Sequence, residues 1–353
     1  MEINYKQLTF AREYRGFTQT ELAKHISGLS QSKLSKFEKG IGFLSDELFN
    51  KIIYFLGFPK SFFYKRIYNF VENPHYRIRS TIRKKTAIQI DSAIKIIGYI
   101  VDQMSESIEW PDFNLDPLDI EDGFSVRNIA EHTRKSLCLK PDDPVRKINN
   151  LLEKHGIIII EIDIAEKFDG ASINTDGGTP VIIINEKFSN DRKRFTLAHE
   201  LGHLLMHILG GFPIPDYRDK EQEANAFASN FLMPEDSIKN SLYGLKLSAL
   251  ASLKNYWLTS MASIINRAFE IKCIDVSRYK YLNIEMSKLG YKKREAVNVY
   301  IDSPTLFFMG YKMHKNELEY SDAELSKAFC LPDDIIKTFC VNGYINNKFK
   351  LSI

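Results

Sequence analysis

Two histidines and a glutamate stand close together in the string HELGH at residues 199–203, and all three side chains are of types that work with metals. Residues four apart on an α-helix lie one turn apart on one face, so the imidazoles of His199 and His203 can share one Zn²⁺. Glu200 then lies where it can take a proton from a water that the metal acidifies. This spacing predicts a helix that carries two metal ligands and a general base for hydrolysis.

A catalytic zinc needs a third protein ligand. Helical periodicity over residues 219–228 places Glu221 and Asn225 on one stripe with small alanines, which would let this helix approach the first closely. We favour Glu221 as the third ligand and keep Glu223 as the alternative, because the two side chains point about 200° apart around the axis. In this arrangement Glu223 points away from the metal. Asn225 is predicted to hydrogen-bond a ligating side chain.

His207 is a further candidate, but it lies eight residues after His199, or about 12 Å along a regular helix. A break of the helix near Gly210 would come too late to turn His207 back toward the metal. We therefore expect His207 at the end of the helix or against a ligand, and not on the metal itself.

The elements that must hold these side chains follow from the hydrophobic pattern. Apolar runs at residues 157–164 and 179–184 predict two buried strands. Helices are predicted over residues 126–139 and 145–153, and helices dominate after the second strand. The stretch 169–172 is interpreted as a turn.

A second group of candidate residues lies in the first 60 residues, where apolar positions recur at helical spacing. Thr18 and Glu21 have the spacing of a capping box, and Ser30 is predicted to begin the next helix. Gly28 and Gly40 are predicted to end these two helices, because glycine tolerates the left-handed conformation. Two short helices joined by a tight turn form a helix-turn-helix.

The helix that begins at Ser30 presents amide and ammonium groups suited to DNA. A glutamine pairs with the edge of adenine in the major groove, and a lysine contacts guanine or phosphate. The start of the preceding helix suits a phosphate. A helical adaptor without DNA affinity is the alternative. The candidate DNA contacts are Thr18, Gln19, Ser30, Gln31, Ser32, Lys33, Ser35 and Lys36.

Charge is unevenly distributed along the chain. Residues 1–90 hold 16 Lys and Arg against 7 Asp and Glu, a balance of +9, so the net charge of +3 leaves −6 for the rest. A basic module favours polyanions such as nucleic acid, although a solvated basic face gives the same count.

Composition excludes several classes of protein. With 353 residues, 44% hydrophobic and 26% charged, the chain is neither collagen-like nor wholly disordered. It has no apolar run of about 18 residues and no export signal at its start, so we expect a cytoplasmic protein without a membrane segment. The four cysteines are far apart and fit neither a metal motif nor a disulfide framework, so we expect reduced thiols in the core.

Two stretches carry family resemblances. RKRFTLAHELGHLLMH at 192–207, EQEANAFA at 221–228 and FLMP at 231–234 closely resemble the ImmA/IrrE family of zinc metallopeptidases, with similarity over roughly residues 126–290. FTQTELA at 17–23 and LSQSKLSKFEKG at 29–40 resemble the XRE (Cro/C1-type) helix-turn-helix family. The first resemblance implies a zincin-like domain with two His and one Glu ligands for zinc, and proteolysis of DNA-bound repressors or antitoxin-like regulators.

These observations predict a multidomain, mostly α protein whose α+β metallopeptidase domain has a small sheet. The predicted boundaries are 1–62 for the helix-turn-helix bundle, 63–124 for a basic segment, linker helix and acidic linker, 125–290 for the peptidase domain and 291–353 for a small C-terminal domain. We expect double-stranded DNA and a repressor or antitoxin-like protein substrate as partners, and leave a homodimer open.

Two alternatives use the same residues differently. One is a transcription factor or antitoxin whose zinc site is structural or sensory, without proteolysis. The other is an antitoxin-like module that holds a toxin through its acidic part. Glu200 argues against a purely structural site, because a metal held only for stability needs no general base.

Overall fold

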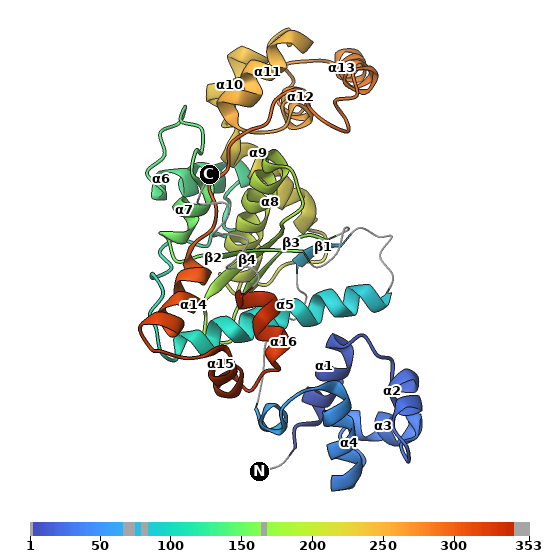
Figure 1. The fold of residues 1–353 in the computed structure, drawn as a ribbon. Coiled ribbons are helices and arrows are strands. Elements are labelled where there is room, and N and C mark those ends of the chain that lie inside the picture. Colours follow the sequence, from blue (N-terminus) through green and yellow to red (C-terminus); the bar gives the residue numbers. More distant parts are fainter. Residues whose placement is uncertain (1–2, 66–74, 79–83, 164–167, 342–353) are drawn as a thin grey trace.

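The computed structural model describes residues 3–65, 75–78, 84–163 and 168–341. Its helices surround one four-stranded sheet, and a separate group of helices lies at the N-terminal end (Figure 1). The predicted fold class, a mostly helical chain with an α+β domain and a small sheet, is confirmed. Within the described ranges, no helix combines the length and the apolar character needed to span a bilayer.

The N-terminal helices are α1 (Tyr5–Tyr14), α2 (Gln19–His25), α3 (Gln31–Glu38) and α4 (Asp46–Leu56). The capping box of Thr18 and Glu21 is confirmed, and the Ser30 hydroxyl accepts a hydrogen bond from the Lys33 N–H at the start of α3. The prediction for Gly28 was wrong in detail, because α2 ends at His25 and Gly28 lies in the turn that follows. Its φ of 85° explains why glycine is needed there.

The sheet has the strand order β1-β3-β4-β2. Strands β2 (Ile158–Ile162) and β4 (Pro180–Asn185) are parallel and confirm the two predicted strands, whereas β3 (Phe168–Asn174) runs antiparallel to β4 and to β1 (His75–Ile78). The interpretation of 169–172 as a turn was therefore wrong. β3 forms despite its polar residues because strands on both sides pair with its backbone.

The two faces of the sheet belong to two hydrophobic cores. One core joins the N-terminal helices, α5 and the C-terminal helices to side chains such as Ile158 and Ile183, and the other joins the remaining helices to Ile159 and Ile182. The helices that follow the N-terminal group are α5 (Lys84–Ser105), α6 (Val126–Ser136), α7 (Ile148–Glu153), α8 (Asn190–His203), α9 (Lys220–Leu232), α10 (Glu235–Leu242), α11 (Leu250–Trp257), α12 (Met261–Glu270), α13 (Val276–Lys288), α14 (Leu306–Asn316), α15 (Asp322–Phe329) and α16 (Asp333–Ile336).

The C-terminal helices return to the N-terminal end of the molecule (Figure 1). The Tyr99 hydroxyl of α5 donates to the Phe329 carbonyl over 2.7 Å, and Arg15 pairs with Asp334 of α16. The first contact joins α15 to α5, and the second joins α16 to the end of α1. The domain boundaries given above stay a prediction.

The cysteines differ from the expectation in one case. All four are free, and Cys273, Cys330 and Cys340 are buried, but Cys138 is exposed. Its φ of 56° belongs to the turn that follows α6, which carries the thiol to the surface while the preceding Leu137 stays buried.

Candidate metal centre

The two histidines of the HELGH string lie in the last turns of helix α8, in the interior of the protein. His199 and His203 are buried, and their Nε2 atoms lie 3.0 Å apart. They come together because residues four apart share one face of the helix. The Nε2 atoms therefore define one end of a possible ligand set.

Helix α9 brings the third donor. The Glu221 carboxylate lies 3.3 Å from His203 Nε2 and 3.5 Å from His199 Nε2. The close approach of the two helices depends on Gly202, since a Cβ at this position would lie 3.0 Å from the ring of Phe227. Small residues at the crossing thus bring the three donor atoms together.

These three residues fit a zinc ion. In the described part of the chain, His199, His203 and Glu221 form the one group of this kind, with ligand atoms within 4.8 Å of one another. Four ligand atoms placed 2.0–2.1 Å from a tetrahedral zinc would lie about 3.3 Å apart, close to the separations found here. Burial lowers the pKa of His203 to about 4, and the facing imidazoles of His199 and then His203 hold the pKa of Glu221 well below its usual range. These shifts favour a neutral imidazole and a carboxylate, the forms that bind metals.

Glu200 lies beside this group and is held by the sheet. Its side chain is buried, and the Ser172 hydroxyl of β3 donates to its Oε2 over 2.7 Å. A Cβ at Gly170 would lie 2.6 Å from Thr196 Cγ2 and 3.1 Å from Glu200 Oε1, so glycine allows the strand to pass this close. Sequence reasoning missed Ser172 because its strand was interpreted as a turn.

The other predicted residues of α9 lie around the ligands. Asn225 Oδ1 is 3.1 Å from Nδ1 of His199. Glu223 lies outside the group of donors, as expected, and its Oε2 lies 2.8 Å from Nε2 of His207. The structure thus brings Glu221 into the ligand group and ties Glu223 to a third histidine.

His207 occupies this position because the helix is distorted earlier than expected. A π-helical turn at Leu204–Ile208 follows α8 directly, so the break begins before His207 and not at Gly210. His207 Nδ1 then lies 2.9 Å from Nδ1 of His203. His207 is outside the ligand group and touches one of its members.

The helix-turn-helix candidates lie on one surface of the N-terminal helices. Thr18 is exposed, and Gln19 and Ser35 are half-buried. On and before α3 the exposed candidates are Ser30, Gln31, Ser32, Lys33 and Lys36. Leu34 and Phe37 of the same helix are buried and fix its orientation.

Two of these side chains are hydrogen-bonded to each other. Gln31 Nε2 donates to Gln19 Oε1 over 2.9 Å, and Gln19 Nε2 donates to Glu38 Oε2 over 2.7 Å. Arg12 binds both oxygens of Glu38 at 2.7 and 2.9 Å. Sequence reasoning did not identify Arg12 or Glu38, which support the candidate surface from inside.

A comparison with protein families finds a match to part of the chain. Residues 152–269 match the Peptidase_M78 family, described as an IrrE N-terminal-like domain. The match supports the resemblance of this part of the chain to ImmA/IrrE metallopeptidases and spans the three clustered donors and Glu200. A comparison with curated proteins found no match.

Proposed function

We propose that this protein is a zinc-dependent endopeptidase joined to a DNA-binding helix-turn-helix. The observation that carries the peptidase half is the convergence of His199 Nε2, His203 Nε2 and the Glu221 carboxylate beside a buried glutamate, within residues 152–269 that match a metallopeptidase family. Two imidazoles and one carboxylate are a donor set of catalytic zinc sites.

A bound zinc ion would supply Lewis-acid polarisation of a peptide carbonyl and lower the pKa of a water. The protein's own part falls to Glu200, whose carboxylate accepts a proton and passes it to the leaving amine. The Ser172 hydroxyl fixes the orientation of that carboxylate by donating to Oε2. Asn225 holds the ring of His199 through Nδ1, so that Nε2 faces the other ligands.

The DNA-binding half of the proposal is supported by the exposed polar face of α3 and by the balance of +9 over residues 1–90. Gln31 and Lys36 are the proposed base contacts, and Thr18 lies before the start of α2, where a phosphate binds well. The proposed substrate, a repressor or antitoxin-like protein, rests on the ImmA/IrrE resemblance.

The test is metal analysis of the purified protein together with a proteolysis screen against proteins from neighbouring operons. We expect about one zinc per chain. Glu200→Gln should keep the zinc and lose about 10²- to 10⁴-fold in turnover, because the ligands remain while the proton acceptor is gone. Unchanged turnover in Glu200→Gln would end the hydrolytic proposal. Zinc without any proteolysis would favour a structural or sensory site.

A further inference from the structure

A row of polar side chains continues from His203 away from the ligand group. His203 Nδ1 is 2.9 Å from Nδ1 of His207, whose Nε2 is 2.8 Å from Oε2 of Glu223. Arg218 donates to both oxygens of Glu223 at 2.9 and 2.8 Å and also to Asp119 at 2.9 Å. We call these five residues the His203 row. The side chains of His203, His207 and Arg218 are all less than 5% exposed.

The hydrogens along the His203 row follow from its far end. Arg218 has only donors and binds both carboxylate oxygens of Glu223, so Glu223 is the acceptor of the row. A neutral His207 must then carry its hydrogen on Nε2, which leaves Nδ1 as an acceptor. His203 must donate from Nδ1, and its Nε2 keeps the lone pair that a metal needs.

We propose that His207 and Glu223 are positioning residues that act in series, through the hydrogen on Nδ1, to hold His203 in its metal-binding tautomer. The proposal rests on the zinc centre proposed above. Either nitrogen of a free imidazole can carry the hydrogen, so fixing it in advance raises the affinity of the ligand for metal.

The fold anchors the row on a distant segment. The π-helical turn at Leu204–Ile208 leaves the carbonyl of Leu205 able to accept a hydrogen bond from the Leu118 N–H over 3.2 Å. Asp119, the next residue, receives Arg218. Leu118 and Asp119 therefore contact both the π-helical turn and Arg218 at the end of the His203 row.

His199 has a much shorter support. Its Nδ1 faces the side-chain oxygen of Asn225, a neutral amide on α9. Separate groups thus orient the two ligands. A single amide, that of Asn225, orients His199, whereas His203 is oriented by His207 and, through it, by Glu223. This separation provides an internal comparison for an experiment.

The central variant is Glu223→Gln, which keeps size and removes one acceptor. Oε2 of Glu223 faces both Arg218 Nη2 and His207 Nε2, so an amide nitrogen at this position can only donate to His207 Nε2, which reverses the row and puts the hydrogen of His203 on Nε2. We expect zinc affinity, measured in competition with a chromophoric chelator, to fall about 10- to 100-fold. The visible absorption of the Co²⁺-loaded protein should shift as well, which a purely structural role would not produce.

A double-mutant cycle tests whether the two residues act in series. His207→Phe should lower zinc affinity by a similar factor, and the double variant should lose no more than the worse single variant, because Glu223 acts only through His207. Glu223→Gln combined with Asn225→Ala should instead multiply the two losses. Losses that multiply for His207 and Glu223 would overturn the serial arrangement.

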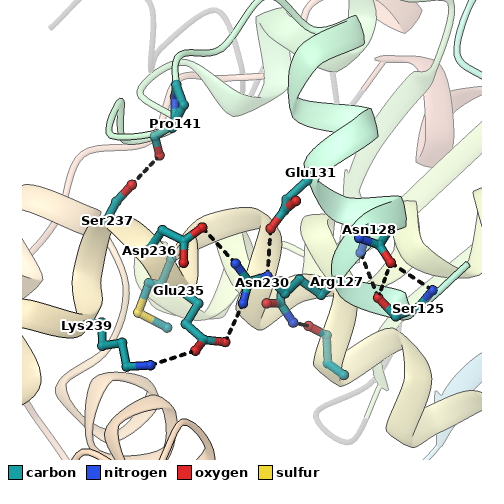
Figure 2. Close-up of polar contacts among 12 residues, drawn as sticks. Ser125, Arg127, Asn128, Glu131, Pro141, Asn230, Glu235, Asp236, Ser237 and Lys239 are labelled. Atoms are coloured by element: carbon teal, nitrogen blue, oxygen red, sulfur yellow. Dashed lines mark hydrogen bonds and ion pairs between the residues drawn. The ribbon is translucent and has the colours of Figure 1, made fainter.

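Glu235→Gln is the matched control. Figure 2 shows Glu235 bound by Arg127, which also binds Glu131 and Asp236, so it is another arginine-bound carboxylate at the start of a helix. Zinc affinity of Glu235→Gln should equal that of the wild type, and circular dichroism without metal should show that Glu235→Gln and Glu223→Gln both keep the helical fold. If the wild type binds zinc and Glu223→Gln binds it with the same affinity, the positioning role is overturned and the metal centre is not. A wild type without zinc overturns the metal centre itself.

Discussion

The proposed metal centre and the candidate DNA-contact surface are supported in the same way but lie in opposite surroundings. The His203 row ends on Arg218, and a second row runs from Gln31 through Gln19 and Glu38 to Arg12. We call these four residues the Gln31 row. In both, an arginine with less than 10% exposure fixes a carboxylate, and the carboxylate orients the polar groups in front of it.

The difference lies at the outer ends. The His203 row ends on an imidazole that is 1% exposed, whereas the Gln31 row ends on an exposed amide. In a neutral imidazole either nitrogen can be the donor, so the hydrogen bond at one nitrogen decides the role of the other. In an amide the oxygen always accepts and the nitrogen always donates, and at an exposed amide water can replace a lost partner. In the proposed functions, burial makes the first row a positioning device, and exposure leaves Gln31 able to turn toward a base.

The largest effect is expected where the Gln31 row is fixed. Arg12→Ala leaves Glu38, which is 5% exposed, without its ion-pair partner. Breaking a buried pair in this way costs about 3–5 kcal/mol, so we expect a clear loss in the free energy of unfolding. Urea unfolding followed by circular dichroism measures it.

Lys51→Ala is the control for this prediction. Lys51 pairs with Glu47 on the exposed side of α4, and exposed pairs contribute about 0–1 kcal/mol. If Arg12→Ala and Lys51→Ala were equally stable, Arg12 would not stabilise the Gln31 row, and the two rows would not share an arginine support.

The next largest effect concerns the two glutamates of α9. Glu221→Ala removes one of three protein ligands, and four-ligand zinc sites contribute about 10–16 kcal/mol in total, so zinc affinity should fall on the order of 10²- to 10³-fold. Glu223→Ala should cost less, about 10- to 100-fold, because it acts on His203 through His207. Chelator competition on both variants ranks them. The opposite ranking would interchange the roles of ligand and support.

The sequence was sufficient where the signal is local. The cap at Thr18, the start of α3 after Ser30 and the shared face of His199 and His203 all depend on residues within four positions of one another. Glu221 follows from the same periodicity within α9. These features need no knowledge of the rest of the chain.

The parts that could not be predicted depend on residues distant in the chain. β3 has no clear alternating pattern and forms because β1 and β4 pair with it, so Ser172 could not be assigned to Glu200. Asp119 reaches Arg218 across 99 positions, and the π-helical turn depends on packing that no short motif records. The distribution of charge along the chain did not show that Arg12 and Arg218 would be buried and would bind carboxylates.

The smallest expected effect belongs to Gln31, the exposed end of the Gln31 row, and to Lys36, five residues further along α3. Gln31→Ala should lose about 1–3 kcal/mol of binding to DNA that the wild type selects from a random library, and little of its binding to unrelated DNA, because a glutamine reads the base edge. Lys36→Ala should lose a similar amount on selected DNA if it contacts guanine. If it contacts phosphate, all sequences should weaken alike and the salt dependence should flatten by about one ion.

Gel-shift titrations at several salt concentrations separate these outcomes, with Lys51→Ala as an exposed lysine outside the candidate set. Zinc content should stay at the wild-type value in every variant, because the Gln31 row and the metal centre have no residue in common. Equal affinity of the wild type and the Gln31→Ala, Lys36→Ala double variant for the selected DNA would show that α3 does not read the sequence. The Gln31 row would then be a structural feature of a helical adaptor. The two rows would still share a buried arginine that binds a carboxylate, but only the His203 row would serve a binding site.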